Sequence, residues 1–384
     1  MAQWNRVPLI DYIELIGGGT PKTTVPEYWN GNIPWLSVKD FNNDKRYAYS
    51  TEKHISQSGF ENSPTKMLHK DDIIISARGT VGEIAMIPFD MAFNQSCYGI
   101  RASRGIDKPF LYYLLKNCIS QLKRMTHGSV FDTITRDTFA NIEVDIPDVE
   151  TQKRISSVLA DIDNKIEVNE AINDNLEQQA AALFSSLYDR SNTEVRFTDL
   201  IQILGGGTPK TGENTYWNGN IAFFTPKDVG TPYTLITEKT ISKEGLSHCN
   251  SRLYPVNTVF VTARGTVGKV GMSGVPMAMN QSCYALVGKE THQLLVYFYT
   301  LKTVDRLKHK ASGAVFDAIT TRDFESEQIM KLSDDDATAF LRVAEPMFQE
   351  VLNNNIENLR LSTLRDSLLP KLMSGEIDVS AVQL

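Results

Sequence analysis

The sequence predicts an α/β (α+β) fold in which two duplicated globular domains are separated by two long antiparallel coiled-coil helices, with approximate two-fold symmetry. Three observations predict this architecture. The chain repeats itself after about 186 residues, each copy combines short β-type runs with one helical stretch, and a long segment without glycine or proline follows the first copy. A period of this length is too long for a solenoid and indicates a duplicated domain with its connector.

The repeat consists of short matches that keep the same order in both copies. Their offset drifts by only a few residues along the chain, which excludes coincidence. The matching segments are 17–23 and 205–211, 28–33 and 216–221, 39–40 and 227–228, 77–82 and 263–268, 94–98 and 280–284, and 130–132 and 315–317.

Each copy has the same predicted order of elements. Short strands such as 73–76 and 258–261 are separated by Gly, Pro and Asn-Gly turns. A helix follows over 110–125 in the first copy and 294–308 in the second, and then come a glycine-rich loop and a final short strand. These elements predict a globule of roughly 150 residues in each copy.

A long helix is predicted after each globule. Residues 151–188 contain no Gly or Pro, and their apolar residues alternate at spacings of three and four, which is typical of a coiled-coil seam. Asn169 and Asn173 take seam positions, where a polar residue fixes the register. The second helix is predicted over 337–373, with Pro346 and Pro370 kinking it or marking its ends.

Neither helix can bury its apolar stripe alone, so we expect the two to pack against each other. The predicted packing residues are Ile155, Leu159, Ile162, Ile166, Leu176, Leu183, Leu352, Ile356, Leu359 and Leu368. The predicted boundaries are 1–150 for the first globule, 151–190 for the first helix, 191–335 for the second globule, and 336–384 for the second helix and tail.

Composition excludes several classes of protein. Charged residues make up 22% and apolar residues 41% of the chain, which argues against disorder. No apolar run approaches the ~18 residues of a membrane span, and the N-terminus does not resemble a secretory signal. The four cysteines form no CxxC pair. We therefore expect a reduced, soluble cytoplasmic protein.

Charge is unevenly distributed. The net charge of −7 disfavours a nucleic-acid partner when it is taken alone. Segments 107–136 and 302–322, however, each carry five basic and two acidic residues. A basic stretch at the same place in both copies suggests a DNA-facing surface, and the alternative is a solvated helix face.

The repeated Gly-Gly-Gly-Thr-Pro-Lys-Thr segment is not a nucleotide-binding loop. A Walker A loop needs glycine directly before its lysine, whereas Pro21 and Pro209 stand there and lack an N–H donor. We interpret the segment as a turn that presents Thr and Lys side chains to a DNA backbone. The alternative is a purely structural turn.

The second repeated turn places Arg78 and Arg264 where a predicted strand ends, and an arginine fork can read guanine or clamp a phosphate. A structural ion pair is the competing interpretation. Gln95 and Gln281 can contact adenine or cap a strand. The full set of DNA-binding candidates is Thr20, Lys22, Lys39, Arg78, Thr80, Gln95, Ser129, Thr208, Lys210, Lys227, Arg264, Thr266, Gln281, Lys308 and Lys310.

Other conspicuous residues have structural interpretations. Trp29 and Trp217 are predicted hairpin and core residues, and Cys97 and Cys283 are predicted buried thiols. The six histidines show no metal-ligand spacing, and no nucleophile elbow or Asn-Pro-Pro-aromatic tetrapeptide of amino-methyltransferases is present. We therefore predict no catalytic residue, no metal and no cofactor in this chain.

The chain resembles the specificity subunit of Type I restriction–modification systems over essentially its whole length. The resemblance rests on the GGGTPKT…YWNGNI openings, the ARGTVG turns, the duplicated plan and the Leu368–Ile377 ending, LLPKLMSGEI. It implies that the globules are target-recognition domains for the halves of a bipartite double-stranded DNA site, with the helices as a ruler between them. The closeness of the two copies departs from the many members whose domains differ.

The resemblance also implies partners. Two methyltransferase subunits would dock on the helices and carry S-adenosylmethionine, and a separate restriction motor subunit would cleave DNA. The alternatives are a self-contained DNA-modifying enzyme with a cryptic active site and a non-DNA adaptor of duplicated binding domains. Segments where the copies diverge, such as 41–50 against 229–235 and 104–127 against 289–311, are candidates for base reading.

Overall fold

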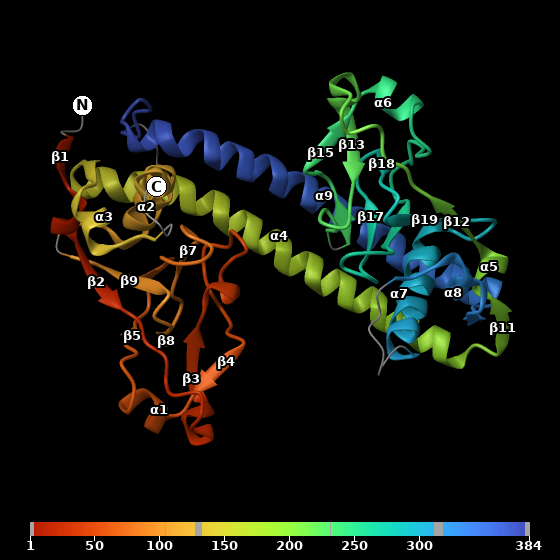
Figure 1. Ribbon diagram of the computed structural model, residues 1–384, viewed down its shortest axis with the longest axis horizontal. Coiled ribbons are helices and arrows are strands. Elements are labelled where there is room, and N and C mark those ends of the chain that lie inside the picture. The colour runs from red at the N-terminus through yellow and green to blue at the C-terminus, as the bar shows by residue number, and fades with distance from the viewer. Residues whose placement is uncertain (1–3, 104, 127–132, 231, 311–317, 381–384) are drawn as a thin grey trace. The chain divides into compact units, whose positions relative to one another are not determined.

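The computed structural model describes residues 4–380 except 104, 127–132, 231 and 311–317. It divides into two compact units (Figure 1). Unit 1 contains Met1–Ile166 and Arg360–Leu384, and unit 2 contains Glu167–Leu359. Each unit therefore combines one globule with a stretch of both long helices.

The globule of unit 1 is built from two four-stranded sheets, ordered β2-β9-β6-β7 and β4-β3-β8-β5, and a separate β1–β10 pair. Its elements are β1 (Asn5–Pro8), η1 (Leu9–Tyr12), β2 (Ile13–Gly17), η2 (Pro26–Tyr28), β3 (Trp29–Leu36), η3 (Val38–Asp40), β4 (Lys53–Ile55), α1 (Gln57–Glu61), β5 (Met67–Leu68), β6 (Ile73–Ser76), β7 (Ile84–Met86), β8 (Met91–Phe93), β9 (Cys97–Ala102), α2 (Lys108–Thr126), α3 (Arg136–Ala140) and β10 (Glu143–Ile146).

The globule of unit 2 has the same plan, with sheets β12-β19-β16-β17-β14 and β15-β13-β18 and a β11–β20 pair. Its elements are β11 (Thr193–Arg196), α5 (Phe197–Leu200), β12 (Ile201–Gly205), η4 (Asn214–Tyr216), β13 (Trp217–Phe224), β14 (Tyr233–Thr234), β15 (Lys239–Ile241), α6 (Lys243–Ser247), β16 (Val259–Thr262), β17 (Val270–Ser273), β18 (Met277–Met279), β19 (Cys283–Gly288), α7 (Gln293–Lys310), α8 (Thr321–Glu325) and β20 (Gln328–Lys331). The mixed helix-and-strand prediction and both predicted globule helices are confirmed.

Strand β6 lies between two hydrophobic cores. Successive side chains of a strand point to opposite faces. Ile73 and Ile75 belong to the core that includes α2, whereas Ile74 belongs to the core shared with the second sheet. In unit 2, Phe260 of β16 faces the corresponding second-sheet core. Burial on both faces explains why these strands are apolar throughout rather than alternating.

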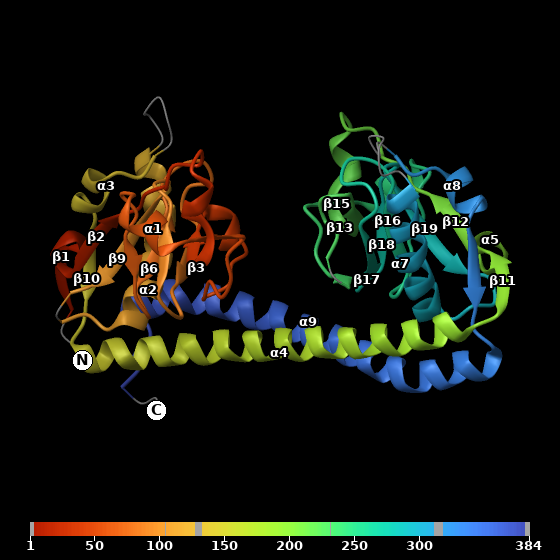
Figure 2. The ribbon, with the colours of Figure 1, turned by 90° about the horizontal axis from the view of Figure 1, so that it is seen from below.

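The long helices are α4 (Val149–Arg190) and α9 (Asp334–Met373). In unit 1 the beginning of α4 lies beside the end of α9 (Figure 2), and Arg365 Nη1 is 2.9 Å from Asp163 Oδ1. In unit 2, Asn169 Nδ2 donates to Glu357 Oε2 at 2.7 Å, and Asn173 Nδ2 donates to the Oδ1 of Asn355 at 3.0 Å. The pairing is therefore antiparallel in both units.

The predicted packing residues fall into two groups. Those near the globules enter hydrophobic cores, and they are Ile155, Leu159 and Leu368 in unit 1 and Leu176, Leu183, Leu352 and Ile356 in unit 2. Ile162, Ile166 and Leu359 are half-buried. Asn169 and Asn173 are buried at the seam, as predicted, with 0% and 5% of their surfaces exposed.

Pro346 and Pro370 were expected to kink the second helix or to mark its ends. Neither proline ends the helix, because α9 continues through both. Both prolines are exposed. Each removes a backbone N–H from the helix, and a solvent-facing position leaves the freed carbonyl within reach of water. Among the described residues, no helix is long and apolar enough to cross a membrane.

Glu177 of α4 provides a pH-dependent test of unit 2. Burial, followed by repulsion from Asp174, raises the pKa of Glu177 from 4.5 to about 7. Between these values the folded state binds more protons than the unfolded state, so stability should fall as pH rises. Glu177→Gln should therefore raise the unfolding free energy of unit 2 at pH 8, by about 1 kcal/mol after allowance for partial exposure, and should have little effect at pH 4.

Urea unfolding at both pH values measures this effect. Asp161→Asn, which neutralises an exposed carboxylate elsewhere on α4, serves as the control. An equal gain from Glu177→Gln at pH 4 and pH 8 would contradict the assignment.

Candidate nucleic-acid interface

The repeated motifs of unit 1 meet at one end of the first sheet. The glycine-rich loop follows β2, the Ala-Arg-Gly-Thr-Val-Gly turn follows β6, and the Asn-Gln-Ser turn precedes β9. Because β9 is antiparallel to both β2 and β6, the ends of those two strands lie beside the beginning of β9. The fold thus brings Thr20 and Gln95 together, although they are 75 residues apart in the chain.

Hydrogen bonds hold the three motifs together. The backbone N–H groups of Ala77 and Arg78 donate to the Ser96 carbonyl oxygen at 2.8 and 3.2 Å, and the Gly19 N–H donates to the Phe93 carbonyl oxygen at 2.9 Å. The Thr20 hydroxyl also donates to the Gln95 side-chain oxygen. Gln95 is thereby held in the cluster.

Unit 2 repeats this arrangement. The N–H groups of Ala263 and Arg264 donate to the Ser282 carbonyl oxygen at 2.8 and 3.3 Å. The Thr208 hydroxyl donates to Gln281. In both units the arginine follows a buried strand and is itself exposed, which confirms its predicted place at a strand-to-turn junction.

Buried hydroxyls that the sequence analysis missed shape the arginine turns. Ser76 is fully buried, and its Oγ donates to the Thr80 carbonyl oxygen at 2.5 Å and accepts from the Glu83 N–H at 2.8 Å. Thr262 makes the corresponding contacts with Thr266 and Lys269. The available signal was a hydroxyl residue at the end of an apolar strand in both copies.

The basic candidates differ in their surroundings. Lys22, Lys39 and Lys210 are exposed. Lys227 Nζ lies 3.5 Å from the exposed carboxylate of Glu238. Lys308 lies across the arginine turn of unit 2, because a Cβ atom on Gly268 would be 2.5 Å from its Cε.

Two further candidates stand apart. Lys310 Nζ lies 2.5 Å from Glu327 Oε1, whose side chain is only 2% exposed. This ion pair accounts for Lys310 without DNA, because a buried carboxylate needs a charged partner. Ser129, like the repeat at 130–132, lies outside the described residues.

Several basic side chains of the two basic stretches, which were predicted to face DNA, contact other residues of their own unit instead. In unit 1, Lys116 Nζ lies 2.8 Å from Asp44 Oδ1. In unit 2, Arg306 Nη2 donates to the Tyr188 hydroxyl at 3.0 Å, and Lys302 Nζ lies 5.6 Å from the centroid of the Tyr188 ring. Many apolar side chains of α2 and α7 are buried in the two large cores. In segments 104–127 and 289–311, the described residues available for the predicted base reading are therefore the exposed ones.

Segment 41–50 departs more clearly from expectation. Asp44 and Arg46 contact the long helices instead of projecting as free base-reading groups. The structural interpretations of the tryptophans and cysteines hold. Trp29 Nε1 donates to the Lys22 carbonyl oxygen at 3.3 Å. Burial, and to a smaller extent the negative charge of Asp40, raises the pKa of Cys97 to about 12.

The glycines of the first motif offer a sharp test. A Cβ atom on Gly18 would lie 2.0 Å from the carbonyl oxygen of Asn94, whereas one on Gly17 would meet nothing within 4 Å. Gly18→Ala should therefore destabilise unit 1 by roughly 1–3 kcal/mol, because the loop and turn would be forced apart. Gly17→Ala is the matched control in urea unfolding. Equal losses from the two substitutions would refute this packing.

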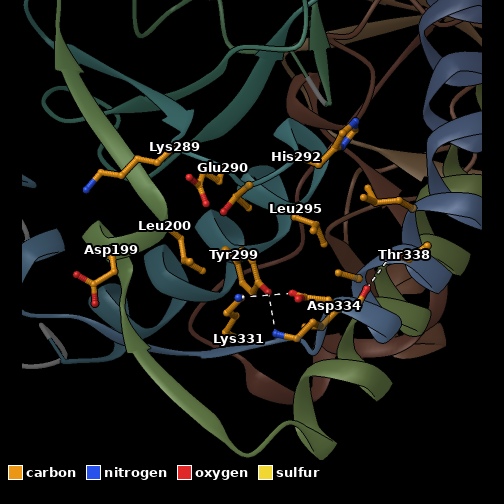
Figure 3. A pocket seen from close by; sticks show the side chains of 14 residues that line it. Asp199, Leu200, Lys289, Glu290, His292, Leu295, Tyr299, Lys331, Asp334 and Thr338 are labelled. Atoms are coloured by element: carbon orange, nitrogen blue, oxygen red, sulfur yellow. Dashed lines mark hydrogen bonds and ion pairs between the residues drawn. The ribbon is translucent and has the colours of Figure 1, made fainter.

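A cavity of about 590 Å³ lies at the other end of the unit 2 sheet (Figure 3). It is lined by the loop after β19 and the beginning of α9, and Ala337 stands in its wall. In unit 1 the equivalent residue is Gln152, which donates to the carbonyl oxygens of Gly105 and Pro147. The shorter side chain of Ala337 contributes to the hollow.

The charged groups of this cavity interact within the unit. Lys331 Nζ lies 3.6 Å from Asp334 Oδ1, and Lys289 Nζ donates to the Thr198 carbonyl oxygen at 2.7 Å. The described residues also contain no group of three or more His, Cys, Asp or Glu side chains placed to hold a metal ion. The repeated clusters are therefore the stronger candidate site.

Comparison with known proteins agrees with this duplicated plan. The family described as "Type I restriction modification DNA specificity domain" matches residues 1–178 and 190–331. The MjaIX specificity subunit of a Type I restriction enzyme from Methanocaldococcus jannaschii is 24% identical, and the match covers 98% of this chain and 94% of that protein.

Two further proteins are similar. The HindI specificity subunit of Haemophilus influenzae is 25% identical over 70% of this chain and 77% of its own. The crystal structure of a Type I restriction–modification S subunit from M. genitalium covers 97% of this chain and 96% of its own with a TM-score of 0.60. At 14% identity, that structure supports the fold.

Proposed function

The chain belongs to the Type I restriction–modification specificity-subunit family, and we propose that each globule reads one half of a bipartite site in double-stranded DNA. Subunits of this family recognise DNA and assemble with other restriction–modification subunits, and they are not themselves catalytic. The observation that carries the proposal is the same motif cluster at the same sheet end in both units.

The chemistry of the cluster fits a DNA backbone with adjacent base edges. Lys22 and Thr20 in unit 1, and their equivalents Lys210 and Thr208 in unit 2, are groups that commonly contact phosphates. Arg78 and Arg264 carry forks suited to guanine edges. Two such clusters in one chain support a site with two halves.

The partners follow from the same proposal. Two methyltransferase subunits dock on α4 and α9 and bring S-adenosylmethionine, and a restriction motor subunit joins them. The modification chemistry then belongs to the partners, and this chain supplies the sequence preference.

Genome-wide mapping of methylated adenines tests the proposal directly. Deleting the gene for this chain should erase one bipartite motif, and restoring the gene should bring that motif back. An unchanged methylation pattern would overturn the proposal, and so would methyl transfer by the purified chain with no partner present.

The lysines of the first motif can be tested by salt dependence. Lys22→Ala or Lys210→Ala should weaken binding to all DNA sequences and reduce the slope of log K against log salt by about one unit. Lys331→Ala, in the cavity at the opposite end of the unit 2 sheet, is the control. A slope unchanged by Lys22→Ala and Lys210→Ala would remove them from the interface.

A further inference from the structure

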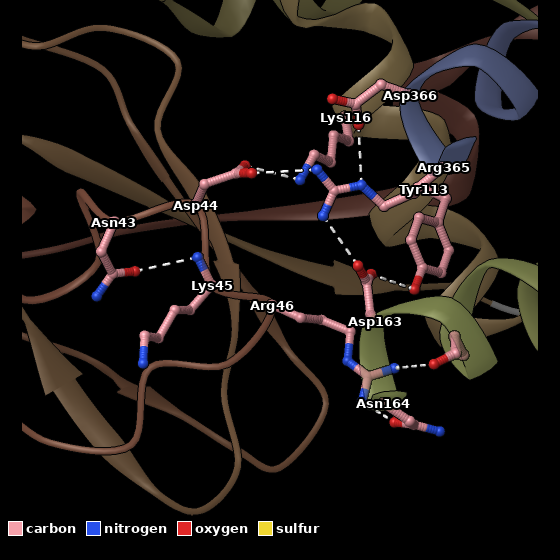
Figure 4. A network of polar contacts seen from close by, with 11 residues as sticks. Asn43, Asp44, Lys45, Arg46, Tyr113, Lys116, Asp163, Asn164, Arg365 and Asp366 are labelled. Carbon is pink, nitrogen blue, oxygen red and sulfur yellow. Dashed lines mark hydrogen bonds and ion pairs between the residues drawn. The ribbon is translucent and has the colours of Figure 1, made fainter. Parts of the chain in front are cut away.

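Residues 43–48, here called the docking segment, join the unit 1 globule to its stretch of the long helices. The backbone of the segment lies along the edge strand β7, because the Met86 N–H donates to the Arg46 carbonyl oxygen at 2.7 Å and the Ala48 N–H donates to the Met86 carbonyl oxygen at 3.1 Å. The side chains of Asp44 and Arg46 reach toward α4 and α9, whereas those of Asn43 and Lys45 point away from the helices (Figure 4).

Arg365 of α9 is the centre of these contacts. It is 4% exposed. Its Nη1 lies 2.9 Å from Asp163 Oδ1 on α4, and its Nη2 lies 3.1 Å from Asp44 Oδ2 in the docking segment. One guanidinium therefore joins both long helices to the globule.

Neighbouring groups extend the network. The Tyr113 hydroxyl of α2 donates to Asp163 Oδ2 at 2.6 Å, and Lys116 holds the second oxygen of Asp44. Arg46 Nη2 donates to Asn164 Oδ1 on α4 at 2.5 Å. Charge-assisted hydrogen bonds are directional, so these contacts fix the orientation of the globule as well as its distance from the helices.

Unit 2 uses different chemistry at the equivalent place. Tyr233 pairs with Met272 as Tyr47 pairs with Met86. At the positions in unit 2 that correspond to Asp44 and Arg46 of unit 1, however, the residues are Gly230 and Pro232. The contact to α9 is aromatic there, with the Tyr233 and Phe348 ring centroids 6.5 Å apart.

We propose that Arg365 is a positioning residue that fixes the first recognition domain on its own stretch of α4 and α9 through Asp163 and Asp44. This inference rests on the proposed function, because the position of a recognition domain on the helices sets the distance between half-sites. The ionic contacts of unit 1 and the aromatic contacts of unit 2 also make each globule specific for its own stretch of helix. In some proteins a buried ion pair adds conformational specificity rather than stability.

The test separates position from stability. Arg365→Met alone leaves Asp163 buried without its cation and should destabilise unit 1. The double variant Asp163→Leu/Arg365→Met removes both buried charges and should recover most of the stability that Arg365→Met loses, with a residual cost because the Tyr113 hydroxyl loses its acceptor. Asp44→Ala cuts the link at the surface without changing the helix pair.

The readout is methylation by the chain co-produced with its modification subunits. The substrates are DNA duplexes with the same two half-sites and spacers that differ by single base pairs. Both Asp44→Ala and the double variant should lower the preference for the native spacer by about two- to fivefold, because the Asp44 carboxylate is 70% exposed and solvent weakens its ion pair. The bases preferred within each half should not change.

Asp366→Asn is the matched control, because Asp366 touches Arg365 Nε but lies outside the link to the docking segment. A wild-type spacer preference in both Asp44→Ala and the double variant would overturn the proposal. Hydrogen exchange of residues 43–48 gives a readout that does not depend on DNA, and protection there should fall in both variants. Unchanged protection in both variants would also overturn the role of Arg365. If the wild-type complex methylated no bipartite site, only the proposed function would be refuted.

Discussion

Replacing Arg78 and Arg264 together with alanine should remove most of the sequence preference of DNA binding while leaving the fold intact. Both side chains are exposed at the end of a buried strand, and their backbone N–H groups are fixed by Ser96 and Ser282. An arginine fork on a guanine edge contributes ~1–3 kcal/mol of discrimination, so two independent losses should lower specificity by about 30- to 20,000-fold.

Single substitutions sharpen this prediction. Arg78→Ala should relax the base choice in one half of the methylated motif only, and Arg264→Ala should relax the other half only. Arg6→Ala, which breaks an exposed ion pair with Glu143 on the β1–β10 pair, is the control. An unchanged binding isotherm in the folded double variant would rule the arginines out as base readers.

Much of this architecture could be predicted because its determinants are local or repeated. The spacing of apolar residues predicted α4 to within two residues at each end, and the absence of Gly and Pro made its length visible. The collinear motifs predicted two similar globules. Their meeting at one sheet end follows from the antiparallel neighbours of β9, which the sequence does not specify.

The contacts between globule and helix were not predictable from local patterns. Asp44 and Arg365 are 321 residues apart in the chain. Neither belongs to a repeated motif, so the sequence pattern does not mark either as a site residue. Segment 41–50 was instead interpreted as a place for base reading because its two copies diverge. Base reading by this segment stays a prediction, and the structure adds that its two copies make different contacts with the long helices.

Lys310 illustrates a second limit. The sequence shows a basic residue near the end of a basic helix, which is typical of a phosphate contact. It does not show that the carboxylate of Glu327, just before β20, is buried and lies against the same lysine. Long-range pairing of charges decides whether a basic residue is available to DNA, and a single sequence does not reveal it.

Phe184→Ala should cause the largest loss of stability, roughly 3–5 kcal/mol, because it removes the centre of an aromatic cluster between α4, α7 and α9. Phe184 is 1% exposed. Its ring centroid lies 5.0 Å from that of Phe298 and 5.5 Å from those of Tyr299 and Phe340. Alanine leaves a cavity that these rigid rings cannot refill by small shifts.

The loss should be confined to unit 2, because Phe184 and its ring partners all belong to that unit. Urea unfolding followed by hydrogen exchange should show earlier exchange in α7 and in the part of α9 before residue 360, with α2 unchanged. Leu183→Ala, at the adjacent half-buried position, should cost about 1 kcal/mol, since less surface leaves water on folding. If α2 lost protection together with α7, the two units would be unfolding as one, and the assignment of Phe184 to a separate core would be wrong.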